Sequence, residues 1–251
     1  MTAGGSGHDG LPPADRASCS RRRVLLACAA GAAAAWLPFA PHAAGSAPAL
    51  AGQSVFRIVR RGADIGEHSI TLQGRDDHLV ATTEVDITMR VLGVPVHRYR
   101  LRVEETWRDG VLATFRSRGD DNGAKISVDA ERDGDELVVE AGGEVRRIGG
   151  RVVTTSLWHG ETPYEGRLLG MEDGRVKQVT GRFLSEERLT LASLPQPVDA
   201  RRYDLRGEFE RELWYDERRR LVRVAFQTRR DGSRIEFVLK ALAGEGRAPF
   251  P

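Results

Sequence analysis

The feature that most constrains the fold of this chain is an alternation of apolar and polar residues over positions 79–107. Ala81, Thr83, Val85, Ile87 and Met89 alternate with polar or small side chains over residues 79–92. A period of two is the spacing of side chains on one face of a β-strand. Gly93 interrupts the pattern, and residues 94–107 resume it. The stretch therefore predicts two long antiparallel strands, which tend to twist and curl.

Shorter alternating segments fill most of the remaining chain. They are separated by glycine-containing turn signals, of which Asp-Gly is typical of tight hairpins, at 109–110, 133–134, 142–143, 173–174 and 231–232. No repeat of fixed period is visible, which argues against propellers and solenoids. We therefore expect an all-β fold, a single curved antiparallel sheet that forms an open or half barrel. The alternation is lost near residues 155–171, where we expect an irregular connection or a short helix.

The N-terminal region has the layout of an export signal. Arg21 and Arg22 follow Ser20 and precede an apolar, alanine-rich run over residues 24–37. This run is too short and too weakly apolar to span a membrane. A basic cluster before such a run is typical of a secretory signal, and the paired arginines are typical of the twin-arginine type. An ordinary secretory signal and a lipoprotein signal ending at Cys28 are the alternatives.

We expect residues 1–51 to be a leader that the twin-arginine export machinery recognises and that is removed in the periplasm of a bacterium. Residues 52–241 then form one β domain, and residues 242–251 a loose tail. Both cysteines, Cys19 and Cys28, lie in the leader, so the mature chain has no disulfide and no thiol nucleophile.

Charge and apolar patterning argue against a nucleic-acid partner and against a transmembrane span in the mature chain. Removing the leader's four arginines and two aspartates from 38 basic and 36 acidic residues leaves 34 of each. A chain without net charge argues against a nucleic-acid surface. No transmembrane span is expected in it either, because the longest apolar run belongs to the leader.

Three segments carry a family resemblance. They are Glu105-Thr106-Trp107 before Asp109-Gly110, the strand Leu213-Trp214-Tyr215-Asp216, and the glycine-containing turn at 61–66. They resemble a family of exported bacterial β-proteins of unknown function, over residues 55–239. The resemblance implies a curved antiparallel sheet, similar to the half barrels of periplasmic lipoprotein carriers. It implies no activity and no catalytic residue.

Two groups of residues are candidates for a binding site. Trp107 and Trp214 either line an apolar pocket or pack in the core and at its rim. Trp158, His159 and Tyr164 form the densest polar and aromatic cluster outside the strands, and binding residues concentrate on such connections. Alternatively, Trp158 simply ties the connection down.

Glu105 is a third candidate, because it shares the apolar side of its strand with Leu101 and Val103. A buried carboxylate is costly unless it is paired, so we expect an arginine partner; a role as general acid is the alternative. The histidines at 68, 78, 97 and 159 lack the spacing of a helical metal site. We expect no metal, cofactor or catalytic residue.

The favoured function is a non-catalytic periplasmic protein that binds a lipid or other apolar ligand in the concave face of its sheet. One alternative is an interaction module of the envelope without a cavity. Another is an enzyme with a site dispersed over several strands. Whether the concave face is empty or filled distinguishes the first two.

Overall fold

The computed structural model describes residues 49–75, 77–192 and 194–244, and they form a 15-stranded sheet with one 3₁₀ turn. The expected leader up to residue 48 and the tail from residue 245 lie outside the described residues. The all-β fold predicted from the alternation is confirmed.

The first eight strands follow one another as an antiparallel meander. Positive φ angles at both Asp109 and Gly110, and at both Asn122 and Gly123, are those of two-residue turns that match the twist of the flanking strands. The meander comprises β1 (Ala49–Arg60), β2 (Ala63–Arg75), β3 (His78–Val91), β4 (Val94–Arg108), β5 (Val111–Asp121), β6 (Ala124–Asp133), β7 (Glu136–Ala141) and β8 (Glu144–Gly149).

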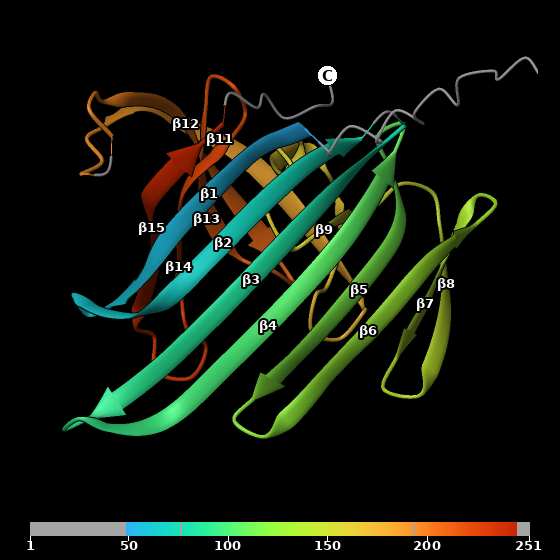
Figure 1. Ribbon diagram of the computed structural model, residues 1–251, viewed down its shortest axis with the longest axis horizontal. Helices are drawn as coiled ribbons and strands as arrows, with labels where there is room; N and C mark the ends of the chain where they lie inside the picture. The colour runs from blue at the N-terminus through green and yellow to red at the C-terminus, as the bar shows by residue number, and fades with distance from the viewer. Residues whose placement is uncertain (1–48, 76, 193, 245–251) are drawn as a thin grey trace, which may run out of the picture. The chain divides into compact units, whose positions relative to one another are not determined.

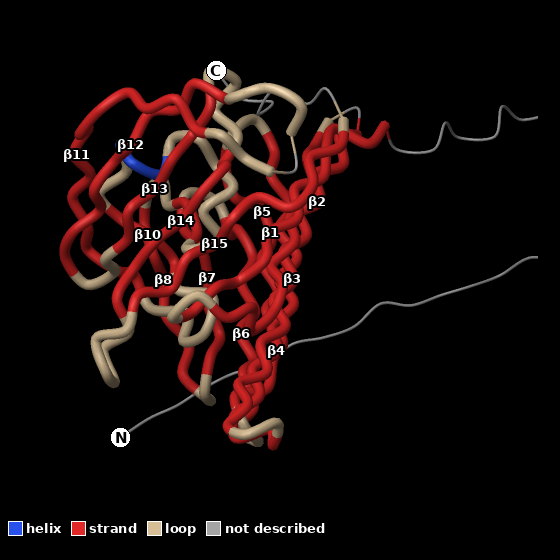
Figure 2. Tube along the Cα trace, turned by 90° about the vertical axis from the view of Figure 1, so that its left-hand side faces the viewer, coloured by secondary structure: helices blue, strands red, loops and turns tan. Residues whose placement is uncertain are grey.

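The second half of the chain joins the same sheet, because its last strand, β15, pairs antiparallel with β1. In the view of Figure 1, β1–β6 cross the front, while β11–β14 lie behind them; Figure 2 shows the same sheet curving round from the side. The strands are β9 (Val153–Thr154), β10 (Arg167–Leu169), β11 (Val176–Leu189), β12 (Val198–Gly207), β13 (Arg211–Asp216), β14 (Leu221–Gln227) and β15 (Arg234–Ala243).

Two details differ from the sequence prediction. We expected the segments outside residues 79–107 to be shorter, but β11 is one strand of 14 residues, because a bulge opposite β12 absorbs a break in the alternation. The sheet is also not antiparallel throughout, because β9 and β10 pair in parallel. The expected irregular connection is confirmed, with a 3₁₀ turn at Thr162–Tyr164.

The concave face of the sheet is filled by this connection. Every residue from 152 to 160 is buried, as are Thr162, Pro163 and residues 168–170. We call residues 152–170 the plug. Gly181 lets the plug approach β11 closely, since a Cβ there would lie 1.9 Å from the carbonyl oxygen of Pro163. The interior of the half barrel is therefore a packed core.

A buried histidine lies near the seam between β1 and β15. The ring of His68 on β2 lies 5.5 Å from the ring of Phe56 and 5.1 Å from that of Phe237. Its Nδ1 has no hydrogen-bond partner among the described residues. Burial lowers the pKa of His68 from its ordinary value of 6.5 to about 4. The ring is therefore neutral at pH 7 and acts as an apolar core residue.

This burial predicts that the fold loses stability in mild acid. Between pH 4 and pH 6.5 the unfolded chain binds the His68 proton and the folded chain does not, so the free energy of unfolding rises with pH over that window. The contribution amounts to about 3 kcal/mol at most. We expect His68→Phe, which keeps the aromatic contacts, to remove this part of the slope in urea unfolding at pH 4–7. A slope identical to that of the wild type would contradict the assignment.

Candidate functional site

Four of the six candidate residues meet in the interior, around the carboxyl group of Glu105. This residue lies on β4 and is 1% exposed. Its Oε2 accepts hydrogen bonds from the indole nitrogens of Trp107, at 2.8 Å, and Trp158, at 2.9 Å. Its Oε1 accepts one from the hydroxyl of Thr154 at 2.8 Å. The expected arginine partner is wrong: among the described residues the hydrogen bonds to this carboxyl come from neutral groups.

The two-residue period of β4 explains why Glu105 and Trp107 lie together. Glu105 and Trp107 are two residues apart, so both point to the concave side together with Leu101 and Val103. The remaining hydrogen-bonding side chains come from the plug, where Thr154, Ser156 and Trp158 are also two residues apart. We call Glu105, Trp107, Thr154, Ser156 and Trp158 the Glu105 cluster.

The plug bends sharply inside this cluster. Leu157 has a φ of 66°, a left-handed conformation that is uncommon for a bulky residue. Its carbonyl oxygen accepts a hydrogen bond of 2.8 Å from the hydroxyl of Tyr215 on β13. Contacts from β4 on one side and β13 on the other thus hold the plug in this shape.

His159 completes the aromatic packing. Its ring centre lies 5.1 Å from those of both Trp107 and Trp158, and the two indoles meet edge to face at 5.5 Å. Its Nδ1 accepts a hydrogen bond from the backbone N–H of Glu161 at 3.2 Å. Burial, helped by the positive charges of Arg151 and Arg219, lowers the pKa of His159 to about 4. At pH 7 His159 is neutral.

The electrostatics of Glu105 are a balance between burial and hydrogen bonding. Burial raises the pKa of its carboxyl above the ordinary value, whereas hydrogen bonds from Ser156, Trp158, Thr154 and Trp107 act in the opposite direction. A raised folded-state pKa means that the folded chain holds this proton longer. The contribution of Glu105 to the free energy of unfolding therefore falls as the pH rises above 4.5.

The cluster is built to hold the plug. A general acid must lie within hydrogen-bond reach of its substrate, and Glu105 is sealed from solvent, with both oxygens already occupied by protein donors. Among the described residues, no group of three or more His, Cys, Asp or Glu side chains is arranged to bind a metal ion. The same part of the chain has no helix long and apolar enough to cross a membrane.

The other two candidates lie elsewhere. Tyr164 is exposed, and its hydroxyl hydrogen-bonds that of Tyr203 at 2.7 Å. Trp214 points away from the plug, opposite its neighbour Tyr215, and donates its indole N–H to Glu187 at 2.8 Å. It therefore does not line a pocket with Trp107 and Trp158.

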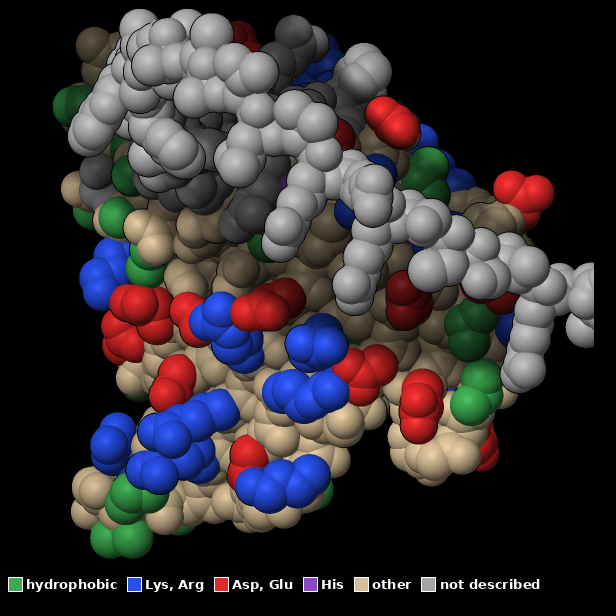
Figure 3. Space-filling view, turned by 45° about the vertical axis from the view of Figure 1, so that its right-hand side comes forward, with side chains coloured by type: hydrophobic (Ala, Val, Ile, Leu, Met, Phe, Trp, Pro, Cys, Tyr) green, Lys and Arg blue, Asp and Glu red, His purple; other side chains and the backbone are tan. Residues whose placement is uncertain are grey.

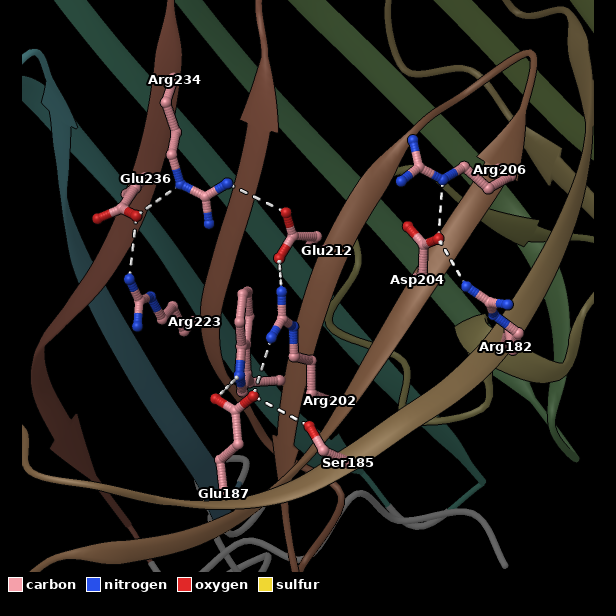
Figure 4. A network of polar contacts seen from close by, with 11 residues as sticks. Arg182, Ser185, Glu187, Arg202, Asp204, Arg206, Glu212, Arg223, Arg234 and Glu236 are labelled. Carbon is pink, nitrogen blue, oxygen red and sulfur yellow. Dashed lines mark hydrogen bonds and ion pairs between the residues drawn. The ribbon is translucent and has the colours of Figure 1, made fainter.

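Trp214 instead contacts a network of charged side chains across β11–β15, of which Glu187, Arg202 and Arg223 are labelled in Figure 4. The guanidinium groups of Arg202 and Arg223 lie 5.1 and 5.0 Å from the centre of its ring. Arg202 also pairs with Glu187 at 3.1 Å and with Glu212 at 2.6 Å. These contacts bury a large aromatic ring beneath paired charges, which is a structural role.

One feature escaped the sequence analysis. The end of the β3–β4 hairpin exposes Val91 by 57%, Leu92 by 100%, Val94 by 62% and Val96 by 53%. We call residues 88–98 the β3–β4 tip. Its signal was present in the sequence as the apolar run Val-Leu-Gly-Val-Pro-Val at a turn, where polar residues are usual.

The structure predicts that Glu105 is worth much more to stability than its neighbour Glu104. Glu105→Ala leaves a cavity and two indole N–H groups without an acceptor, so we expect a loss of about 3–5 kcal/mol in the free energy of unfolding. Glu104→Ala is the matched control, because Glu104 is exposed and pairs only with Arg102 at the surface. There we expect a loss below about 1 kcal/mol.

Urea unfolding followed by circular dichroism measures both variants, and Glu105→Gln adds a test of charge against shape. We expect Glu105→Gln to fall between the two alanine variants, since an amide keeps one acceptor oxygen. Equal stability of Glu105→Ala and Glu104→Ala would show that the cluster does not hold the plug.

Comparison with known proteins agrees with this reading of the fold. The chain is similar to a crystal structure of a β-barrel-like protein from Brucella abortus, described as a domain of unknown function, DUF1849. The TM-score is 0.56 at 10% sequence identity, over 76% of this chain and 96% of that one. No curated protein shows significant sequence similarity to this chain.

The sequence of the chain also matches a protein-family model. The model of the domain of unknown function DUF6134 matches residues 56–240, which run from the first core residue of β1 to the last strand. The expectation of a β-protein family of unknown function is confirmed. The chain belongs to the DUF6134 family.

Proposed function

We propose that this chain is an exported, non-catalytic interaction module of the bacterial envelope, and that it binds through its outer surface at the β3–β4 tip. The observation that carries the proposal is the group of exposed apolar side chains at this tip. An apolar group of this kind in water is unfavourable, and in soluble proteins it commonly marks an interaction site.

The filled interior supports binding on the outside. A crevice with a volume of about 30 Å³ lies beside the plug, which is room for only a few water molecules. Pockets for small ligands measure about 300–1,000 Å³. A lipid in the concave face would therefore have to displace the plug and break the hydrogen bonds of the Glu105 cluster.

Binding of an apolar ligand is the second candidate, because Trp158 of the plug and several aliphatic side chains line the crevice, beside Arg219 and Arg220. The aliphatic residues are Ile70, Leu72, Leu221 and Leu242. A stoichiometric lipid in native mass spectra of the purified protein would favour this candidate over the interaction module. The third candidate, an enzyme with a dispersed site, has no comparable support, since Glu105 and His159 are both buried.

Cross-linking in cells tests the interaction module. A photoreactive benzoylphenylalanine in place of Leu92 is expected to form cross-links on irradiation, because the position is exposed and belongs to the binding surface. The matched control is the same substitution at Val145 of β8, which is exposed to 66% but lies outside the tip. Electrophoresis and mass spectrometry identify the products. Equal cross-linking at both positions, or none at position 92, would contradict the proposal.

Export is the second part of the proposal, and it is supported by the leader sequence. The double variant Arg21→Lys, Arg22→Lys lacks both guanidinium groups of the pair. We expect its precursor to stay in the cytoplasm, because the paired arginines are the recognition element of this signal. Arg23→Lys, just outside the pair, is the control and should be exported normally. Cell fractionation and the intact mass of the product are the measurements, with Gly52 as the expected first residue. Normal export of the double variant would point to an ordinary secretory signal.

A further inference from the structure

We infer that the β3–β4 tip docks on the surface of an anionic lipid bilayer, with its apolar end among the headgroups and its arginines against lipid phosphates. The inference deepens the proposed function and rests on it, since it names the partner of the same surface. Shape, backbone conformation and charge each support it.

The end of the tip, residues 90–96, extends beyond the neighbouring strands. The last pair between β2 and β3 joins Gly66 to Ile87, and the last pair between β4 and β5 joins Tyr99 to Asp121. Beyond these pairs β3 and β4 pair with each other as far as Val91 opposite Val94. Neighbouring hairpins still contact the base of the tip, since Arg60 donates to Met89 Sδ, His97 pairs with Asp121 at 3.1 Å, and the backbone N–H of Asn122 donates to the carbonyl oxygen of Arg98. Past these contacts, the three residues 90–92 at about 3.3 Å each give a free end of about 10 Å, visible at the lower left of Figure 1.

The residue at the extreme end is unfavourable there for two independent reasons. Leu92 is fully exposed, and its φ of 51° is one that side chains other than Asn, Asp and Gly adopt at a cost. Other hairpins of the chain place Asp109 or Asn122 at the equivalent position before glycine. Leu92 improves neither the turn nor the packing of the tip, so an apolar partner outside the chain explains it best.

The charges of the tip have one sign. Residues 88–98 contain Arg90 and Arg98 and no acidic residue. Among the described residues neither arginine forms an ion pair, whereas Arg100 pairs with Asp86 at 3.0 Å. Figure 3 shows a lobe at its lower left with apolar side chains at its end and Lys and Arg side chains, with some Asp and Glu among them, behind these. Apolar groups that enter the headgroup layer, with cations behind them, suit an anionic membrane surface.

A bilayer fits this surface better than a protein does. The tip is convex and offers about five apolar residues, while a stable protein interface uses about 20–30 residues on each side. A second copy of the chain is disfavoured as the partner for the same reason, because the tip offers too few residues for a stable dimer interface. A fluid headgroup layer, in contrast, accommodates a narrow wedge without a preformed socket.

Vesicle sedimentation of the purified exported protein tests the inference. We expect binding to vesicles of phosphatidylethanolamine with phosphatidylglycerol, and little binding to phosphatidylcholine vesicles. Leu92→Asp with Val94→Asp should weaken binding at least about tenfold, because two apolar side chains no longer leave water. Val145→Asp is the matched control and should bind like the wild type.

A second pair of variants tests the role of charge. Arg90→Gln with Arg98→Gln should reduce the preference for anionic vesicles about tenfold, and Arg57→Gln, an exposed arginine in the middle of β1, should leave it unchanged. All substitutions are at exposed positions, and equal melting temperatures by circular dichroism show that the fold is intact.

Three results would overturn the inference: no binding of the wild type to anionic vesicles, equal binding of the Leu92 and Val94 double variant, or tip-dependent dimers in sedimentation without lipid. Cross-links from position 92 to a protein, combined with absent vesicle binding, would leave the interaction module standing and remove the bilayer as its partner. Absent cross-links at position 92 in cells would remove the proposed function itself.

Discussion

The structure depends on one buried carboxylate. Glu105 brings a charge-bearing group into the core, and the indoles of Trp107 and Trp158 with the hydroxyl of Thr154 supply its hydrogen bonds. Two of these donors, Thr154 and Trp158, belong to the plug. The carboxyl group of Glu105 therefore receives its full set of hydrogen bonds only when the plug fills the concave face. An open half barrel has an apolar face to cover, and here the chain covers it with its own connection.

This arrangement gives the inside of the molecule a structural role. The interior groups with the strongest chemistry, Glu105 and His159, are both buried and contact the aromatic rings of the plug and of β4. The outer surface has two different characters. Over β11–β15 the charges are paired around Trp214, which makes that region self-contained. At the β3–β4 tip the apolar side chains and two arginines have no counterpart among the described residues, so a partner of that chemistry is expected there.

The alternation of residues was sufficient to predict the long strands β3 and β4, the hairpin between them and the side on which Glu105 lies. Periodicity acts over neighbouring residues and does not depend on the rest of the fold. It failed at β11, where a bulge shifts the pattern without ending the strand. It also gave no partner for Glu105, since Trp158 comes from a segment 53 residues away, and a local pattern does not indicate which distant segments meet.

The sequence alone therefore determined the fold class and the faces of the strands, because both depend on the local order of residues, whereas the export signal before residue 52 stays a prediction. Only the tertiary structure decided that the concave face is full, that Trp214 lies apart from Trp107, and that the apolar run near Leu92 projects beyond its neighbours. Those three properties depend on how far each strand extends relative to the next and on which distant segments meet. Both are set by the packing of the whole sheet, and the pattern of a short stretch of residues does not contain that information.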